Sequence, residues 1–362
     1  MSKPQTQFYD PLKTFWDNFD NGPFPDTDPK IYQNRVDPQF TFLGKKISSP
    51  FGIPAGPLPT SKHIKYAFER GFDVNVYKTQ RSVQFACNEF PNILYLDIDG
   101  DLTLDKASKP QLGKNKTDRP KENISITNSF GNPSKGPEFW VDDLKKAIAA
   151  ANKNQLVIMS VVGTIQEGFS SVDYFEDFAK TARLAADAGA EAIEINLSCP
   201  NVASEGVLCY SPDAVASICK KTKEQIGNIP LIAKLGYYSF EQEPLLRKVI
   251  EDTTGVVDGI ASINTISAPV VDEKGKQALP GKGRLKSGIC GAGVKWAGLD
   301  MVKRLNSIRE ELGLEFEIIG VGGVMTPSDF HQYRKAGADL VQSATGAMWN
   351  PDLAAEIKET LR

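Results

Sequence analysis

The chain has 362 residues, of which 41% are hydrophobic and 24% are charged, as expected for a soluble globular protein with room for one large α/β domain and additional segments. Its formal net charge of −3 argues against a nucleic-acid partner, because binding to a phosphate backbone needs a basic face. No apolar run approaches the roughly 18 residues of a membrane span, and the first residues lack the apolar core of a secretory signal, so we expect a cytoplasmic protein with no membrane partner.

The cysteine and histidine content restricts the chemistry that the chain can perform. The five cysteines are odd in number and share no CxxC spacing. They indicate free thiols in a reducing compartment rather than a disulfide framework or a zinc site. The two histidines, His63 and His331, both fall in amphipathic helical stretches. The sequence therefore predicts no metal centre and argues against a catalytic triad or a Cys–His pair.

The N-terminal segment differs in composition from the rest of the chain. Its first 39 residues are rich in Asp, Pro and Phe, which predicts an irregular arm lying on the domain or on a partner. A short hairpin is expected over 41–47. We therefore divide the chain into an arm with the start of this hairpin, residues 1–45, and a barrel domain, residues 46–362.

An insertion at about 80–123 interrupts the regular pattern of the domain. Within it, we expect a hairpin over 93–104 and an exposed loop over 106–121. The apolar run 124–127 is expected to be an accessory strand that joins at this insertion.

The rest of the chain alternates between buried strands and amphipathic helices. The expected principal strands are 51–55, 72–79, 156–162, 192–197, 231–235, 259–264, 317–321 and 340–344. The expected helices are 61–70, 138–152, 172–188, 212–226, 240–252, 295–312, 328–336 and 351–361. Such alternation indicates a parallel sheet with right-handed crossovers, and eight units favour a closed (β/α)8 TIM barrel over an open sheet.

Polar and small residues follow the expected strands at their carboxyl ends, where barrels of this kind carry their chemistry. These residues include Ala55, Gly56, Lys78, Thr79, Asn128, Asn196, Lys234, Asn264 and Thr265. Taken one at a time, a strand-end lysine or asparagine is more often a solvated residue at the rim. A lysine inside an apolar strand is costly, however, unless it has an anionic or acceptor partner. Together they predict a cradle for a flat ligand with carbonyls and ring nitrogens.

Glycine-rich loops follow the last two strands. Gly320-Val-Gly-Gly323 comes after the seventh strand and Ala344-Thr-Gly346 after the eighth. Barrels commonly bind phosphate at this pair of loops, where small residues let backbone N–H groups approach the anion. The alternative is two tight turns that need glycine for their dihedral angles. No GxGxxG fingerprint of a Rossmann fold is present.

A thiol lies in the loop after the fourth strand. That strand ends in the polar run Asn196-Leu-Ser-Cys-Pro-Asn201. Without a suitable histidine, proton abstraction would fall to Cys199, while Cys209 and Cys290, in loops on the same face, stay open as alternatives. The loop 200–211 is expected to act as a lid.

At these residues the sequence resembles the dihydroorotate dehydrogenase family, over roughly 49–361. The motifs that carry the resemblance are Asn196-Leu-Ser-Cys-Pro-Asn201, Asn128-Ser-Phe-Gly-Asn-Pro133, Ala233-Lys-Leu235, Asn264-Thr265 and Gly320-Val-Gly-Gly323. The family is an FMN-binding barrel that oxidises dihydroorotate to orotate in pyrimidine biosynthesis. By this resemblance, Cys199 is the base that takes the C5 proton while a hydride leaves C6 for flavin N5.

The resemblance also implies roles for the other residues. The substrate would be held by Lys78, Asn128, Asn196, Asn201, Asn264 and Thr265. The flavin would be held by Ala55, Gly56, Lys78, Thr79, Asn128, Lys234 and Gly288, and its phosphate by Gly322, Gly323, Ala344 and Thr345. Lys234 would face the flavin N1–O2 edge, where negative charge develops on reduction.

The sequence departs from the family pattern at two places near the substrate. It has Ser287-Gly-Ile-Cys290-Gly291 where Gly-Gly-x-Ser-Gly is frequent, and Asn132 where leucine is common. A dihydropyrimidine dehydrogenase on the same barrel is one alternative, although Asn201 favours dihydroorotate. Two further alternatives are a Schiff-base aldolase that uses Lys234 or Lys78 and a non-catalytic flavin binder.

The cysteine at the base position resembles the soluble class of the family. We therefore expect a homodimer that reduces a soluble acceptor such as fumarate, with transfer to NAD through a second, iron–sulfur subunit as the alternative. The five scattered thiols could not themselves hold an iron–sulfur cluster.

Overall fold

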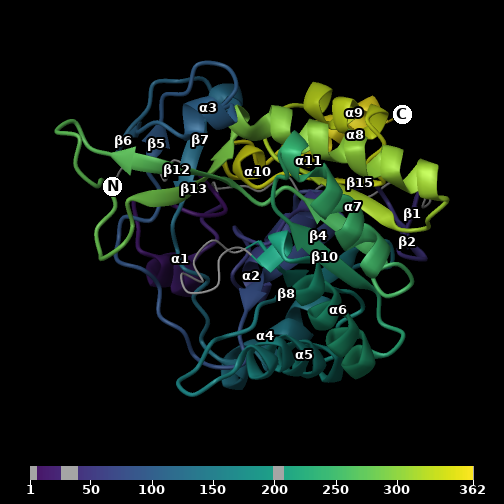
Figure 1. The fold of residues 1–362 in the computed structure, drawn as a ribbon. Helices are drawn as coiled ribbons and strands as arrows, with labels where there is room; N and C mark the ends of the chain where they lie inside the picture. Colours follow the sequence, from purple (N-terminus) through teal and green to yellow (C-terminus); the bar gives the residue numbers. More distant parts are fainter. Residues whose placement is uncertain (1–5, 26–39, 199–207, 362) are drawn as a thin grey trace.

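The computed structural model describes residues 6–25, 40–198 and 208–361 (Figure 1). Its main sheets form two closed barrels of different size. None of the helices described there is long and apolar enough to cross a bilayer.

The larger barrel has eight parallel strands, as the sequence predicts. Its strands are β3 (Phe51–Ile53), β4 (Val74–Gln80), β8 (Leu156–Val161), β9 (Ile193–Asn196), β10 (Leu231–Leu235), β11 (Gly259–Ser262), β14 (Glu317–Val321) and β15 (Leu340–Gln342). Each pairs in parallel with the next, and β15 pairs with β3 to close the cylinder. Several strands end two residues earlier than expected, which places the residues that follow them in loops at the mouth of the barrel.

Helices connect the strands and cover the barrel. They are α2 (Ser61–Glu69), α4 (Pro137–Ala149), α5 (Ser171–Asp187), α6 (Pro212–Ile226), α7 (Glu243–Asp252), α8 (Lys295–Leu312), α9 (Pro327–Lys335) and α11 (Leu353–Thr360). Proline lies in the first turn of α4, α6, α7 and α9, where a missing N–H has no helical partner to lose. The sequence predicts all of these helices within about three residues. The short helix α10 (Thr345–Trp349) was not expected.

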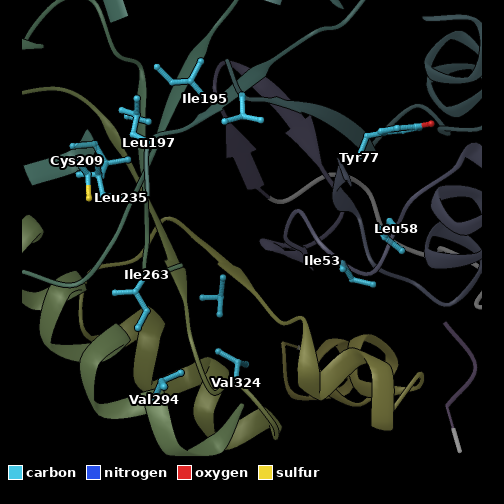
Figure 2. Close-up of a cluster of buried hydrophobic side chains, with 14 of the residues drawn as sticks. Ile53, Leu58, Tyr77, Ile195, Leu197, Cys209, Leu235, Ile263, Val294 and Val324 are labelled. Carbon is cyan, nitrogen blue, oxygen red and sulfur yellow. The ribbon is translucent and has the colours of Figure 1, made fainter. Parts of the chain in front are cut away.

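The alternation of side chains along each strand produces two hydrophobic layers. One layer fills the barrel interior, where Val76, Ile158 and Ile232 from separate strands belong to one cluster. The other lies between the strands and the helices. Figure 2 shows part of it, with Leu197 and Leu235 beside Cys209. Because both faces are buried, the strands read as continuous apolar runs in the sequence.

A smaller closed barrel, which the sequence does not predict, joins the insertion to a later segment. Its strands are β5 (Tyr95–Leu96), β6 (Gln111–Lys114), β7 (Ser125–Asn128), β12 (Ile266–Val271) and β13 (Lys286–Gly291). In Figure 1 these strands gather at one side of the molecule, apart from α4, α5 and α6. Closure depends on β6, which pairs in parallel with β12 across more than 150 residues of sequence.

The predicted hairpin over 93–104 is therefore wrong. Strand β5 pairs with β7 and with β6, where Tyr95 lies opposite Lys114, and helix α3 (Leu104–Ala107) comes between β5 and β6 in the sequence. The predicted loop over 106–121 accordingly contains a strand. The expected accessory strand at 124–127 is confirmed as β7.

The N-terminal arm is more regular than its composition predicts. It contains helix α1 (Phe15–Asn21), which begins with a capping box formed by Thr14 and Asp17. Phe8, Phe15 and Phe19 are buried in the same cluster as the barrel-helix core. The predicted hairpin is confirmed as β1 (Phe40–Phe42) and β2 (Lys45–Ile47).

Candidate active site

A cavity at the carboxyl ends of the barrel strands brings together residues that are far apart in the sequence. Of the predicted site residues, those lining it are Ala55, Gly56, Lys78, Thr79, Asn128, Asn196, Lys234, Asn264, Thr265, Gly322, Gly323, Ala344 and Thr345. Cys199, Asn201 and most of the predicted lid over 200–211 lie outside the described residues. The cavity thus contains lysines, amides and both glycine loops in one space.

Gly288 is the predicted residue that does not line the cavity. It lies in β13 opposite Asn128 of β7. A Cβ at this position would come 2.3 Å from Oγ1 of Thr265. The glycine therefore allows close packing that sets the positions of Asn128 and Thr265, which do line the cavity.

Three polar side chains at the ends of β9 and β11 hold one another in place. Oδ1 of Asn196 accepts a hydrogen bond from the backbone N–H of Ser198 at 3.3 Å and from Nδ2 of Asn264 at 3.3 Å. Nδ2 of Asn264 also donates to Oγ of Ser198 at 3.0 Å. This network fixes the amide of Asn196 with its oxygen toward Asn264, so its NH2 group is left to donate to a ligand.

Lys234 enters the top of the barrel interior from β10, with only 5% of its surface exposed. Burial lowers the pKa of Lys234, and the carboxylate of Glu194 on the neighbouring strand raises it. Among the residues that the structure describes, the ammonium has no ion pair within 4.0 Å. Because an unpaired buried charge is costly, this arrangement favours an anionic or acceptor atom of a ligand beside Lys234.

Glu194 belongs to a short polar chain below the cavity. Its carboxylate accepts from Oγ of Ser160 at 2.9 Å, and the hydroxyls of Ser160 and Thr79 lie 3.0 Å apart. Burial raises the pKa of Glu194, while Lys234 lowers it. The chain therefore links Thr79 in the cavity wall to the interior of the barrel.

The two glycine loops need glycine for reasons that the structure makes explicit. Gly323 has a φ of 63°, and a Cβ there would come 2.6 Å from Cβ of Lys295. A Cβ on Gly346 would come 2.2 Å from the carbonyl oxygen of Val324. Gly346 thus brings the loops after β14 and β15 against each other, and Gly323 lets the loop after β14 pack on the start of α8; both glycines line the cavity.

Two observations test whether the cavity fits a large cofactor with many acceptors and donors. Gln342, at the end of β15, lines the cavity, and its Oε1 is buried with no hydrogen-bond partner in the described chain. A Cβ on Gly56 would meet no protein atom within 4 Å, so the backbone there borders open space. Together with Lys234, which has no ion pair within 4.0 Å among the described residues, these groups fit a ligand such as FMN.

Sequence reasoning missed Gln342 and the arm residues Tyr9 and Phe15, which also line the cavity. A polar residue at the end of the apolar strand β15 carries the same signal that pointed to Lys234. The arm residues had no such signal, because their position depends on tertiary contacts.

The thiols in the described chain are unfavourable bases. Burial raises the pKa of Cys290, which lines the cavity, to about 11 and that of Cys209 to about 12. Cys209 does not line the cavity. At neutral pH both are protonated, and the thiolate is the basic form.

A parallel eight-stranded barrel with glycine loops after its last two strands, buried lysines and an amide cluster at its mouth is typical of (β/α)8 enzymes that act on a ligand in the barrel mouth. Residues 102–362 match the family model described as dihydroorotate dehydrogenase. The chain therefore belongs to the dihydroorotate dehydrogenase family, whose members are FMN-dependent flavoproteins.

Individual relatives agree with this assignment. The chain is 38% identical over 355 residues to a dihydroorotate dehydrogenase from Dictyostelium discoideum, covering 96% of this chain and 95% of that protein. It is 29% identical over 228 residues to the catalytic subunit of dihydroorotate dehydrogenase B (NAD(+)) from Methanocaldococcus jannaschii, covering 61% and 66%. A Solibacter usitatus protein provisionally named dihydroorotate dehydrogenase A (fumarate) is 26% identical over 275 residues, covering 75% and 84%.

Proposed function

We propose that this chain oxidises dihydroorotate to orotate, using FMN, with Cys199 as the base. The observation that carries the proposal is one cavity in which an ordered amide cluster, two buried lysines and two glycine loops meet, in a member of the dihydroorotate dehydrogenase family. When bound, FMN supplies the hydride acceptor.

The residues at the two ends of the cavity have different tasks. Gly322, Gly323, Ala344 and Thr345 would hold the phosphate of FMN through backbone and hydroxyl donors. Lys234 would stabilise negative charge on the ring system, because its ammonium is buried and has no competing ion pair among the described residues.

The substrate end offers donors for a pyrimidine with carbonyl groups and a carboxylate. Lys78, Asn128, Asn196, Asn264 and Thr265, which line the cavity, would form this end together with Asn201. The fixed amide of Asn196 would donate through its NH2 group, and the ammonium of Lys78 would pair with the carboxylate.

Cys199 is proposed to take the proton from C5 of the substrate. The cavity-lining side chains of the described chain include no histidine, and the Cys290 thiol, with a pKa of about 11, would be a poor base at neutral pH. These facts support a base from the loop after β9. An unperturbed thiol pKa of about 8.5 would make proton removal faster as the pH rises toward that value.

The electron acceptor and assembly state follow the soluble class of the family. We propose direct reduction of a soluble acceptor such as fumarate by a homodimer in the cytoplasm. Transfer to NAD through a second subunit is the alternative, and the relatives are named for both acceptors. Steady-state assays of the isolated chain with fumarate, NAD and a soluble quinone separate these routes, since turnover with quinone alone would contradict the class.

Anaerobic bleaching of the flavin tests the reaction itself. Dihydroorotate should bleach the flavin of the purified protein rapidly, whereas dihydrouracil should not. Bleaching by dihydrouracil alone would instead support a dihydropyrimidine dehydrogenase. A protein purified without flavin that reacts with carbonyl compounds through Lys234 would support an aldolase.

A further inference from the structure

The N-terminal arm, residues 6–25, reaches the active-site cavity. Tyr9 and Phe15 line it, although both precede the first barrel strand by more than 30 residues. Figure 1 shows α1, which carries Phe15, in purple on the side of the molecule that holds the small barrel. The arm is thus part of the wall of the site and not only a covering of the core.

The cation that the arm approaches is Lys78. Its ammonium lies 5.7 Å from the ring centroid of Phe15 and 5.9 Å from that of Phe130. Both distances are within the roughly 6 Å over which an aromatic face attracts a cation. Lys78 is 5% exposed, so water contributes little to holding its side chain in one place.

The position of Phe15 is fixed by hydrogen bonds within the arm. Asn18, one turn further along α1, is fully buried. Its Oδ1 accepts from the N–H of Asp10 at 2.6 Å, and its Nδ2 donates to the carbonyls of Asp10 and Thr14 at 2.9 Å each. The capping box at Thr14 fixes the start of the helix. Phe15 is therefore held on a rigid element.

Phe130, which lies next to Phe15, is also held in place. It lies in the loop between Asn128 and Asn132, and two buried arginines donate to carbonyls of that loop. Nη2 of Arg284 donates to the carbonyl of Ser129 at 2.9 Å, and Nε of Arg81 to that of Asn132 at 2.9 Å. The rings of Phe15 and Phe130 lie 6.0 Å apart, in an edge-on arrangement.

We infer that Phe15 is a positioning residue of the substrate site: together with Phe130 it holds the Lys78 ammonium in the cavity, so that the arm sets the affinity for an anionic, carboxylate-bearing pyrimidine. The inference rests on the proposed function, which places the substrate carboxylate beside Lys78. An ammonium already held against two neighbouring rings loses little freedom when it pairs with a carboxylate, which favours binding of the anion.

Phe19 provides a matched control on the same helix. It is buried, packs on Phe139 with ring centroids 5.1 Å apart, and belongs to the same aromatic cluster as Phe15. It does not line the cavity, and its cation contact is with Lys135. If Phe15 only docked the arm on the domain, Phe15→Leu and Phe19→Leu would have equal effects on orotate binding.

The experiment measures the binding of orotate and of its uncharged methyl ester to the flavin-loaded protein, by the change in flavin absorption. Phe15→Leu should weaken orotate binding about fivefold, the size of a partly desolvated cation–π contact, and should change ester binding much less. Phe19→Leu should leave the ratio of orotate affinity to ester affinity (the orotate-to-ester ratio) as in the wild type. Phe15→Tyr, which keeps an aromatic ring, should also keep the wild-type ratio. In a Lys78→Met background, Phe15→Leu should have no further effect, because its partner is gone.

Equal losses in Phe15→Leu and Phe19→Leu, or an unchanged orotate-to-ester ratio in Phe15→Leu, would overturn the inference. If Phe15→Leu does not fold, Phe130→Leu removes the second ring and must lower the same ratio. A wild-type protein that dihydroorotate does not bleach and orotate does not bind would instead refute the proposed function, so the two failures are distinguishable.

Discussion

Replacing Ala344 by glutamate tests the assignment of the phosphate site. Ala344 lines the cavity between β15 and α10, is partly exposed and has an ordinary φ of −92°. A longer side chain is therefore compatible with the backbone there. Gly323 is a poorer position for the test, because its Cβ would meet Lys295 at 2.6 Å and any loss of FMN could come from that collision.

The magnitude follows from Coulomb repulsion. At an effective dielectric constant of about 20, two like unit charges about 5 Å apart repel by roughly 3 kcal/mol. Solvent at a partly exposed position reduces this to about 2 kcal/mol per charge. Because the phosphate carries nearly two charges, the binding free energy of FMN would then weaken by about 4 kcal/mol, which raises its Kd roughly a thousandfold.

Ala344→Gln is the matched control, since it has nearly the same size and no charge. We expect the glutamate variant to be purified colourless and the glutamine variant to retain FMN, with both showing the same thermal unfolding once FMN is removed. Titration of the apoproteins with FMN, followed by fluorescence quenching, gives the two Kd values. A glutamate variant that keeps stoichiometric FMN would refute the site assignment.

Three further perturbations test other parts of the structure. Cys199→Ala should still bind orotate but slow flavin reduction by about 10²–10⁴-fold, measured by stopped flow, while Cys209→Ala, away from the cavity, should be near normal. Lys234→Met should lower the reduction potential of bound FMN, because a cation that stabilises the reduced anion is lost. An unchanged potential in a dye-linked titration would show that Lys234 does not act on the flavin. Burial lowers the pKa of His63 to about 3, so below its unfolded pKa of about 6.5 the unfolded state binds a proton that the folded state does not. Stability in urea should fall as pH decreases from about 6.5 to 3, and His63→Phe should flatten that decline.

The large barrel was predictable because each of its strands is a buried apolar run that a helix follows in sequence. The polar exceptions in those runs, Lys78 and Lys234, led to the cavity for the same reason. Gln342 gave an equivalent signal at the end of β15. Local patterning therefore located most of the site that the large barrel supplies.

The small barrel and the arm were not predictable in the same way. Strand β5 has only two residues and its partner β6 lies beyond a helix, so no local alternation reveals the pairing. Helix α1 has a capping box, Thr14 with Asp17, but it is short and flanked by the proline-rich segment. The contact of Phe15 with Lys78 joins residues more than 60 positions apart, and only the folded chain brings them together.

The two closed barrels supply different parts of the wall of the cavity. Asn128 and Cys290 belong to strands of the small barrel, and Thr265 immediately precedes one. The glycine loops that border the proposed phosphate site follow strands of the large barrel. Substitutions in the small barrel would therefore change the part of the cavity wall that holds Asn128 and Thr265 without altering the glycine loops, so these two parts of the cavity can be varied separately.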